Sequence, residues 1–183
     1  MVKGSPSKLA LGVALVLTGI LLIGGGQKQI DSRSDTFAQE PVKIEGFVSE
    51  EENVSLIPNR ILIPDVDIDL EIGRSKIVGG YWEVFSDKAG WGEGSGLPGR
   101  EGNQVIFAHA RKGLFLPLRS IKPGAKIYVL TDSSWFNYTV SEIKEVIPSQ
   151  IEVIAPTPDE TLTLYTCSGF GDSMRLIVIA KRV

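Results

Sequence analysis

The sequence predicts an all-β domain, either a barrel or a sandwich, over residues 58–183. Seven or eight short segments of strand length there are rich in β-branched and aromatic residues, and Gly, Pro, Asp and Ser fill the gaps between them. One segment alternates apolar and acidic residues with a period of two. This part of the sequence shows no long amphipathic helical pattern. Many short strands without such a helix are typical of barrels and sandwiches.

Each predicted element is a short run between turn-forming residues. Residues 60–63 are mostly apolar and end at Pro64, and residues 66–71 carry the alternating pattern of a half-buried strand. Residues 104–109 form an apolar run, and residues 114–118 are expected to form one helical turn. The remaining strands are expected at 126–131, 136–146, 161–167 and 175–181.

The N-terminal segment differs from the rest of the chain, because Leu9 to Gly26 contains no charged residue. As a helix that rises about 1.5 Å per residue, it is roughly 27 Å long, close to the thickness of a hydrocarbon core. We expect residues 1–8 in the cytoplasm, an uncleaved transmembrane signal-anchor at 9–26, and the folded domain outside the cytoplasm. The alternative, a cleaved secretory signal, places the domain in the same compartment.

Residues 27–57 lack helical or strand periodicity and are rich in acidic residues, so we expect an extracytoplasmic linker there. The formal net charge is −3, and without a basic excess no nucleic-acid partner is expected. A single cysteine excludes an intramolecular disulfide. With one cysteine and one histidine, the chain lacks the usual ligands of a zinc site, and no metal or cofactor is expected.

The single cysteine, Cys167, is a candidate nucleophile. A lone cysteine in a strand is usually a small buried apolar residue. Cys167, however, ends the predicted strand 161–167, where a loop begins. An unpaired thiol outside the cytoplasm tends to oxidise, so the presence of one there suggests that it has a use. It therefore lies at the rim of the predicted barrel, in a position that suits catalysis.

Two further residues lie at the ends of neighbouring apolar runs. His109, the only histidine, ends the run 104–109, and imidazole is the usual proton-exchange partner of a nucleophilic thiol. Arg175 opens the strand after Cys167. If 161–167 and 175–181 form a hairpin with Cys167 opposite Arg175, both side chains project on the same face. Arginine is always charged, so Arg175 is a candidate for holding a substrate carbonyl and its oxyanion.

Together these residues resemble the sortase family. Thr163-Leu164-Tyr165-Thr166-Cys167 is similar to the sortase TLxTC signature, and the arginine follows eight residues later, as in sortases. The segment 97–109, which leads to the histidine, is also similar, except that alanine stands where many sortases have glycine before the histidine. The resemblance covers roughly residues 58–183.

The resemblance implies a sortase-like eight-stranded β-barrel and a cysteine transpeptidase. Cys167 would attack a carbonyl within an LPxTG-like sorting motif near the C-terminus of a secreted protein, with His109 as acid/base and Arg175 as oxyanion partner. An amine acceptor, either a cell-wall peptidoglycan precursor or a pilin lysine, would then resolve the acyl-enzyme. Two protonation states stay open at this point: a His–Cys ion pair at rest, or a neutral pair of which only a minor fraction is ionised.

A substrate groove is expected beside the nucleophile. We expect it to involve Phe107, Tyr165 and Thr166, with the loop 148–159 as one wall. The apolar residues of that loop are expected to meet the apolar part of the sorting motif; they are Ile151, Val153 and Ile154.

Two other functions remain as alternatives. One is a cysteine hydrolase of cell-wall peptides that uses the same Cys–His pair with water as acceptor. Such enzymes usually carry the nucleophile at a helix N-terminus, whereas Cys167 ends a predicted strand. The other is a non-catalytic anchored β-domain that binds a wall component, which predicts an inert, buried Cys167.

Overall fold

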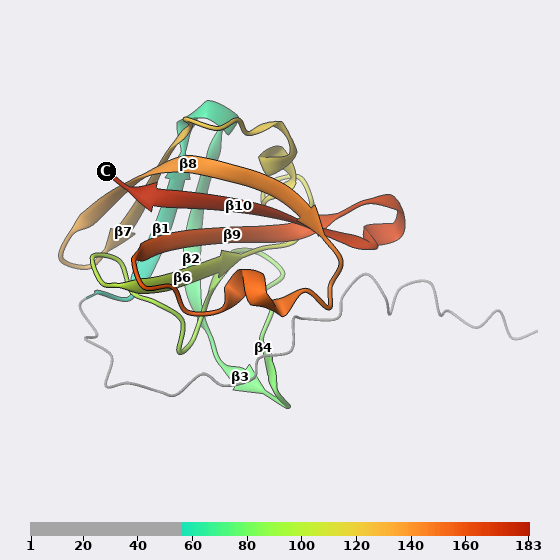
Figure 1. Cartoon of the computed structure of the whole chain (residues 1–183), viewed down its shortest axis with the longest axis horizontal. Helices are drawn as coiled ribbons and strands as arrows, with labels where there is room; N and C mark the ends of the chain where they lie inside the picture. Colours follow the sequence, from blue (N-terminus) through green and yellow to red (C-terminus); the bar gives the residue numbers. More distant parts are fainter. Residues whose placement is uncertain (1–55) are drawn as a thin grey trace, which may run out of the picture. The chain divides into compact units, whose positions relative to one another are not determined.

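The computed structural model of the chain describes residues 56–183 (Figure 1). The predicted cytoplasmic segment 1–8, the predicted anchor 9–26 and residues 27–55 of the predicted linker lie outside the described residues. Within residues 56–183, no helix has the length and apolar character that a membrane crossing requires. The β-domain predicted at 58–183 falls entirely within the described part.

Eight strands close into a barrel, which confirms the all-β prediction and the eight-stranded barrel that the family resemblance implied. Their bounds are β1 (Pro58–Ile63), β2 (Ile68–Ser75), β5 (Ala89–Gly92), β6 (Gly102–Phe107), β7 (Lys126–Thr131), β8 (Trp135–Val146), β9 (Glu160–Ser168) and β10 (Met174–Arg182). The order around the barrel is β1-β2-β5-β6-β9-β10-β8-β7. The pairs β2–β5 and β6–β9 are parallel, and the other neighbouring pairs are antiparallel. A small hairpin of β3 (Ile77–Val78) and β4 (Tyr81–Trp82) extends away from the barrel (Figure 1).

Alternate residues of the strands fill the barrel interior, as the period of two in a β-strand requires. On β9, Leu162 and Leu164 belong to this core, and on β10 so do Leu176 and Val178. The residues between them therefore point to the outer face of the barrel. That outer face, on β6, β9 and β10, is the one that carries the candidate site.

A second apolar cluster covers part of this outer face. Its members are Trp82, Val105, Phe107, Val146, Ile154, Tyr165 and Ile177. Three rings form a stack, in which the Phe107 ring lies 5.6 Å from Trp82 and 4.9 Å from Tyr165, centroid to centroid. The 3-10 helix η4 (Ile151–Ile154) crosses in front of β6 (Figure 1) and contributes Ile154. This cluster fixes the β8–β9 loop, residues 147–159, against the barrel.

The structure also corrects three predicted boundaries. The strand predicted at 66–71 begins at Ile68, because residues 64–66 form the 3-10 helix η2 and Asp67 has a left-handed φ of 53°. The strand predicted at 104–109 ends at Phe107, so His109 lies in the following loop. The helical turn predicted at 114–118 is the 3-10 helix η3 (Leu116–Ser120).

Strand β5 was not predicted, because half of its residues are glycine. The crowded surroundings explain this composition. A Cβ atom at Gly90 would lie 3.2 Å from the ring of Phe107 and closer still to the hydroxyl of Ser75. All four residues of the strand are buried, so its place in the barrel depends on neighbours that lie far away in the sequence.

Candidate active site

Cys167 and Arg175 face each other across β9 and β10. Their Cα atoms are direct partners in the antiparallel register, which confirms the hairpin register expected from the sequence. Residues in this relation share a face, with Cβ atoms about 4.5–5.5 Å apart. Tyr165 and Ile177, two residues further along each strand, belong to the second apolar cluster on the outer face. Cys167 and Arg175 therefore also lie on the outer face, next to that cluster.

Arg175 is 3% exposed, and backbone carbonyls hold its guanidinium. Its Nη1 donates to the carbonyl oxygens of Asp172 and Met174 at 2.9 and 3.0 Å. Asp172 ends the 3-10 helix η5 (Phe170–Asp172) in the β9–β10 connection, the red loop in Figure 1, and Met174 is the first residue of β10. The loop thus fixes a permanent positive charge beside Cys167.

His109 reaches the same end of the barrel through the pairing of β6 with β9. Beyond the last paired residues, the amide of Ala108 donates to the carbonyl of Tyr165 at 3.4 Å. The hydroxyl of Thr166 donates to the carbonyl of Ala108 at 2.7 Å. These two bonds extend the parallel register by one residue on each strand, so His109 follows at the same end of the barrel as Cys167.

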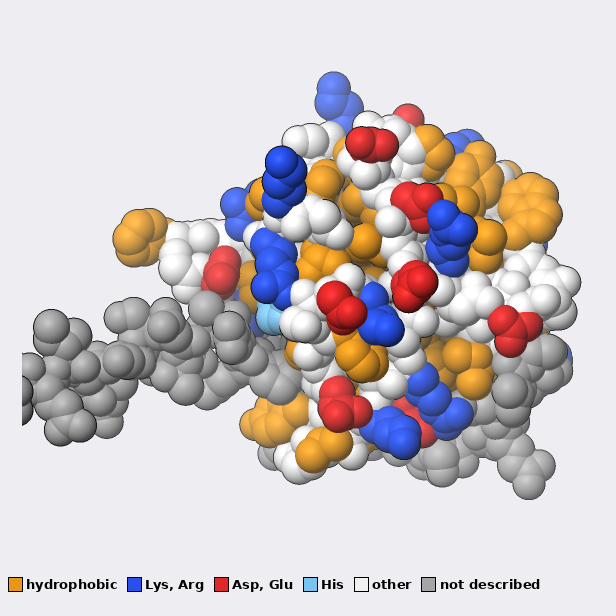
Figure 2. All heavy atoms as spheres, turned by 180° about the vertical axis from the view of Figure 1, so that it is seen from behind, with side chains coloured by type: hydrophobic (Ala, Val, Ile, Leu, Met, Phe, Trp, Pro, Cys, Tyr) orange, Lys and Arg blue, Asp and Glu red, His pale blue; other side chains and the backbone are white. Residues whose placement is uncertain are grey.

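The loop after β6 turns sharply at His109. The His109 carbonyl accepts hydrogen bonds from the amides of Arg111 and Phe115, at 3.0 and 3.1 Å. Phe115 is fully buried in the barrel core, so its side chain anchors the turn to the core. The histidine side chain is half-buried and reaches the surface next to basic side chains (Figure 2). This turn, and not the strand itself, presents the imidazole.

The electrostatic surroundings oppose ionisation of both candidate groups. Burial lowers the pKa of His109, the charge of Arg111 lowers it further, and Asp172 partly opposes this. Burial raises the pKa of Cys167, Arg175 partly opposes this, and Asp172 raises it further. The thiol and the imidazole are therefore both predominantly neutral at neutral pH, which favours the second of the two protonation states left open by the sequence.

A mostly apolar pocket lies next to Arg175, between the outer face of the barrel and the β8–β9 loop. Its lining residues are Val146, Ile147, Pro148, Gln150, Val153, Ile154, Tyr165, Arg175 and Ile177. Three of these carry polar side chains: Gln150, Tyr165 and Arg175. The pocket thus joins an apolar surface to the charged end of the site.

Asn103 fixes one end of the pocket wall. Its Nδ2 donates to the carbonyls of Val153 and Ala155, at 3.1 and 3.0 Å, and its Oδ1 accepts from the Thr163 hydroxyl at 2.7 Å. The side chain is 3% exposed, so these bonds lie away from water and are costly to break. Asn103 therefore ties the β8–β9 loop to both β6 and β9.

Three of the six predicted substrate-binding residues line the pocket: Val153, Ile154 and Tyr165. Phe107 lies outside the pocket lining and supports the Tyr165 ring from one side. Ile151 is 38% exposed on the surface of η4.

Thr166 is separated from the pocket by the strand itself. Neighbouring residues of a β-strand point to opposite faces, so Thr166 and Tyr165 cannot both face the groove. Thr166 is 1% exposed, and its hydroxyl holds the carbonyl that precedes His109. Thr166 therefore lies on the opposite face of β9 from the pocket and supports the backbone just before His109.

The sequence reasoning missed three residues near the site. Asn103 was visible as a polar residue at the start of an apolar run, which is a signal for a buried hydrogen-bonding group. Asp172 and Arg111 affect the pKa of His109 through space, and nothing in the linear sequence indicates those distances. Arg111 also donates to the carbonyl of Ser86, which links the histidine turn to the β4–β5 connection.

The arrangement has the parts that acyl transfer through a cysteine requires. Cys167 supplies a thiol, His109 a proton-exchanging group, and Arg175 a fixed cationic donor at the same end of the barrel. Within the described residues 56–183, no group of three or more His, Cys, Asp or Glu side chains is arranged to hold a metal ion.

Comparison with known proteins agrees with this geometry. The family model of the sortase domain matches residues 61–183. Sortase A of Streptococcus agalactiae serotype III (strain NEM316) is 36% identical over 129 residues, which are 66% of this chain and 51% of that protein. Among solved structures, the pilus-related sortase C of Group B Streptococcus has a TM-score of 0.62 at 29% identity, covering 81% of this chain and 80% of that one. The sortase D5 transpeptidase of Clostridium perfringens has a TM-score of 0.59 at 26% identity, covering 68% and 77%.

The chain spans about half of the length of the first of these relatives, and 64% of the length of two further sortase A proteins, from Bacillus anthracis and Listeria monocytogenes. The family match itself extends from the middle of β1 to residue 183 and so includes the other seven strands of the barrel. It includes the histidine turn and the β9–β10 hairpin with the candidate cysteine and arginine. This chain belongs to the sortase family.

Proposed function

We propose that this chain is a membrane-anchored cysteine transpeptidase. It cleaves an LPxTG-like sorting motif near the C-terminus of secreted proteins and transfers the new carboxyl end to an amine acceptor. The observation that carries the proposal is that the barrel brings Cys167, Arg175 and His109 to one end of β6, β9 and β10, beside a mostly apolar pocket. Family membership and the sortase D5 transpeptidase among the structural neighbours support it.

The reaction begins with a proton transfer from the Cys167 thiol to the His109 imidazole. The thiolate attacks the carbonyl carbon of the scissile peptide bond, and Arg175 donates hydrogen bonds to the oxyanion that forms. When the C–N bond breaks, the imidazolium gives its proton to the leaving amine, and a thioester to Cys167 remains.

The second half of the reaction reverses these roles. An amine of the acceptor attacks the thioester carbon, and His109 takes a proton from the attacking nitrogen. The C–S bond breaks, the thiol regains its proton, and an amide joins the two chains. The acceptor is an amine of a peptidoglycan precursor or a lysine of a pilin subunit.

The pocket beside Arg175 holds the apolar part of the sorting motif. Its lining combines apolar side chains from β8, β10 and the β8–β9 loop with the ring of Tyr165 and the guanidinium of Arg175. A substrate whose apolar residues enter this pocket places the following carbonyl near Arg175 and Cys167. The half-buried state of Cys167 also suits a working nucleophile better than the inert, buried cysteine of a purely binding domain.

The proposed location is the cell membrane, with residues 9–26 as a single-pass anchor and the barrel outside the cytoplasm. A tether of this kind raises the effective concentration of newly exported chains and of lipid-linked wall precursors. No nucleic acid and no cofactor takes part in the proposed reaction.

Detection of the acyl-enzyme tests the proposal. Incubation of the protein with LPxTG-type peptides, followed by intact mass measurement, is expected to show an adduct on Cys167 that equals the N-terminal part of the peptide. Cys167→Ala is expected to show neither adduct nor cleavage while its circular dichroism remains native. If Cys167→Ala cleaves these peptides as fast as the unchanged protein, a cysteine mechanism is excluded.

A further inference from the structure

The hydroxyl of Tyr165 is a buried polar group without a hydrogen-bond partner. Among the described residues, its oxygen is enclosed and accepts or donates no hydrogen bond. Buried hydroxyls in folded proteins are nearly always paired, so an unpaired one calls for a specific explanation, such as a role in binding or catalysis. Tyr138 shows the usual case in the same barrel: it is fully buried, and its hydroxyl donates to Glu160 Oε1 at 2.7 Å.

Tyr165 also stands at the centre of the candidate site. It precedes Cys167 by two residues on β9, so the two side chains share the outer face of the barrel. Its ring lines the pocket together with Arg175. Burial raises the pKa of its hydroxyl, and the charges of Arg175 and Cys167 act on this pKa in opposite directions. The tyrosine with the unpaired hydroxyl therefore borders the pocket on the same face of the barrel as Cys167 and Arg175.

The pocket supplies few hydrogen-bond donors for a peptide. Apart from Tyr165, its polar side chains are those of Gln150 and Arg175. A peptide that buries its apolar side chains there also removes its backbone carbonyls from water, and each carbonyl then needs a donor.

We propose that Tyr165 is a substrate-positioning residue whose hydroxyl donates a hydrogen bond to a backbone carbonyl of the bound sorting peptide, N-terminal to the scissile bond. This inference rests on the proposed transpeptidase function. In the substrate-free structure the oxygen is covered, and the bound peptide reaches it when the 147–150 end of the β8–β9 loop moves outward, while Asn103 holds the 153–155 end. Ile147 and Gln150 bond to each other through their backbones and through the Gln150 side chain, so that end of the wall can move as a unit.

The proposal separates stability from activity, because the hydroxyl contributes no bond to the free protein. Tyr165→Phe is therefore expected to leave the melting temperature unchanged or to raise it by a few degrees. With an LPxTG-type peptide, kcat/KM is expected to fall about tenfold, mainly through a higher KM, because the bond forms equally in the bound substrate and in the transition state.

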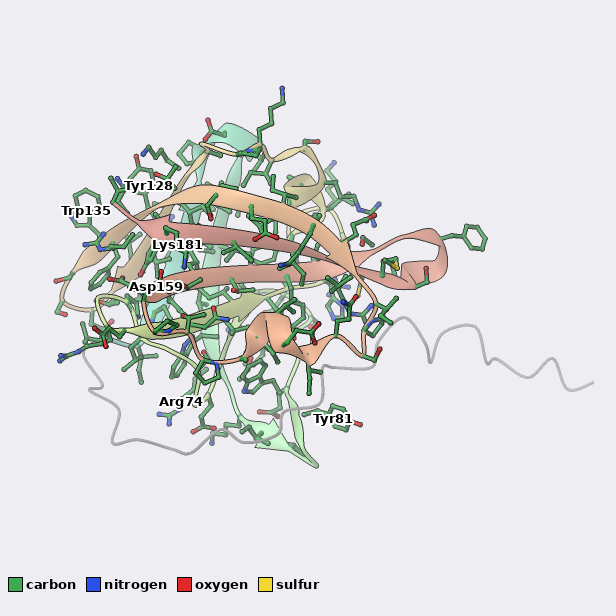
Figure 3. All side chains as sticks on the ribbon, in the orientation of Figure 1. Arg74, Tyr81, Tyr128, Trp135, Asp159 and Lys181 are labelled. Carbon is green, nitrogen blue, oxygen red and sulfur yellow. The ribbon has the colours of Figure 1, made fainter. Side chains whose placement is uncertain are left out.

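Tyr138→Phe is the matched control, because it removes a paired hydroxyl from a buried tyrosine. Tyr138 lies on β8, opposite Arg182 near the C-terminal end of β10. Figure 3 shows Lys181 and Asp159 at that end of the β9–β10 hairpin, away from its connecting loop. This control is expected to lower the melting temperature by a few degrees and to keep kcat/KM within about twofold of the unchanged protein.

Peptides with a single amide-to-ester replacement identify the acceptor carbonyl, since an ester carbonyl accepts a hydrogen bond more weakly than an amide carbonyl. Each link N-terminal to the scissile bond is replaced in turn. One replacement is expected to lower kcat/KM for the unchanged protein and to have no further effect on Tyr165→Phe, because interacting groups are not additive.

Three results would overturn the inference. They are a Tyr165→Phe variant with kcat/KM within twofold of the unchanged protein, a loss of melting temperature as large as that of Tyr138→Phe, and equal sensitivity of both proteins to every ester peptide. If the unchanged protein forms no acyl-enzyme with any sorting peptide, the proposed function fails and this inference fails with it. If the unchanged protein is acylated and Tyr165→Phe behaves like it, only this inference fails.

Discussion

Burial has opposite effects on the two residues that exchange a proton in the proposed reaction. It lowers the pKa of His109 below its ordinary value of 6.5 and raises that of Cys167 above its ordinary value of 9.0. The imidazolium is therefore lost before the thiolate appears as the pH rises. Between the two values the resting pair is neutral, and only a small, pH-independent fraction has both groups ionised.

This order of ionisation predicts the pH dependence of kcat/KM. A bell-shaped profile is expected, with an acidic limb at an apparent pKa below 6.5, a basic limb above 9.0 and a plateau between them. The rate of alkylation of Cys167 by iodoacetamide should rise with pH through the basic limb. An alkylation rate that is already maximal at pH 7 would instead indicate a resting thiolate–imidazolium pair.

The candidate reacting residues were easier to find in the sequence than the groups that surround them. Cys167 and His109 are the only residues of their kinds in the chain, and the spacing to Arg175 agrees with a hairpin register that the structure confirms. The contribution of Asp172 to both pKa values depends on how the β9–β10 loop folds. Thr166 was placed in the groove, although its position next to Tyr165 in the strand turns it to the opposite face.

At the level of elements, the β8–β9 loop is held in place by one buried side chain. Asn103 bonds to two carbonyls of this loop and to the hydroxyl of Thr163 on β9. The apolar face of η4 adds Ile154 to the outer cluster. The pocket wall is therefore held in two ways, by the hydrogen bonds of Asn103 to Val153 and Ala155 and by the apolar packing of Ile154 between them.

Replacement of Asn103 is expected to affect both stability and substrate binding. Asn103→Ala leaves two buried carbonyls and a hydroxyl without their partner, which should cost about 1–3 kcal/mol in the free energy of unfolding. KM should rise with the loosened wall. Asn59→Ala is the matched control, because Asn59 bonds to Asp132 at an exposed position, and its unfolding free energy should change by no more than about 0.5 kcal/mol. Denaturant unfolding and peptide kinetics measure both effects, and an unchanged KM in Asn103→Ala would show that the wall does not bind substrate.

Most elements were predictable because β-branched and aromatic residues are frequent in them. Strands β7, β8, β9 and β10 were predicted at 126–131, 136–146, 161–167 and 175–181, close to their observed bounds. Strand β5 was missed because Ala89–Gly92 is short and half glycine, and its place is set by Ser75, Trp82 and Phe107 on other elements. The strand expected at 66–71 starts late because of the left-handed turn at Asp67.

At the scale of the whole domain, closure of the barrel brings together candidate site residues that lie far apart in the sequence. The parallel pairing of β6 with β9 places the histidine turn beside the cysteine strand, although more than fifty residues separate them in the chain. The C-terminal strand β10 lies between β9 and β8 and supplies the arginine. Composition and strand count limit the fold to a barrel or a sandwich, and the resemblance to sortases indicated an eight-stranded barrel, but the order of strands cannot be derived from composition or strand count.

Transfer to an amine, in preference to water, is the central claim for the molecule as a whole. The direct measurement incubates the protein with an LPxTG-type peptide and rising concentrations of a short glycine peptide, and resolves the products by mass. Cys167→Ala and His109→Ala serve as blanks. The account predicts an amide-linked product that grows with glycine peptide concentration, at the expense of the free acid. Free acid as the only product, across a range of amine acceptors, would contradict the account and favour a cysteine hydrolase.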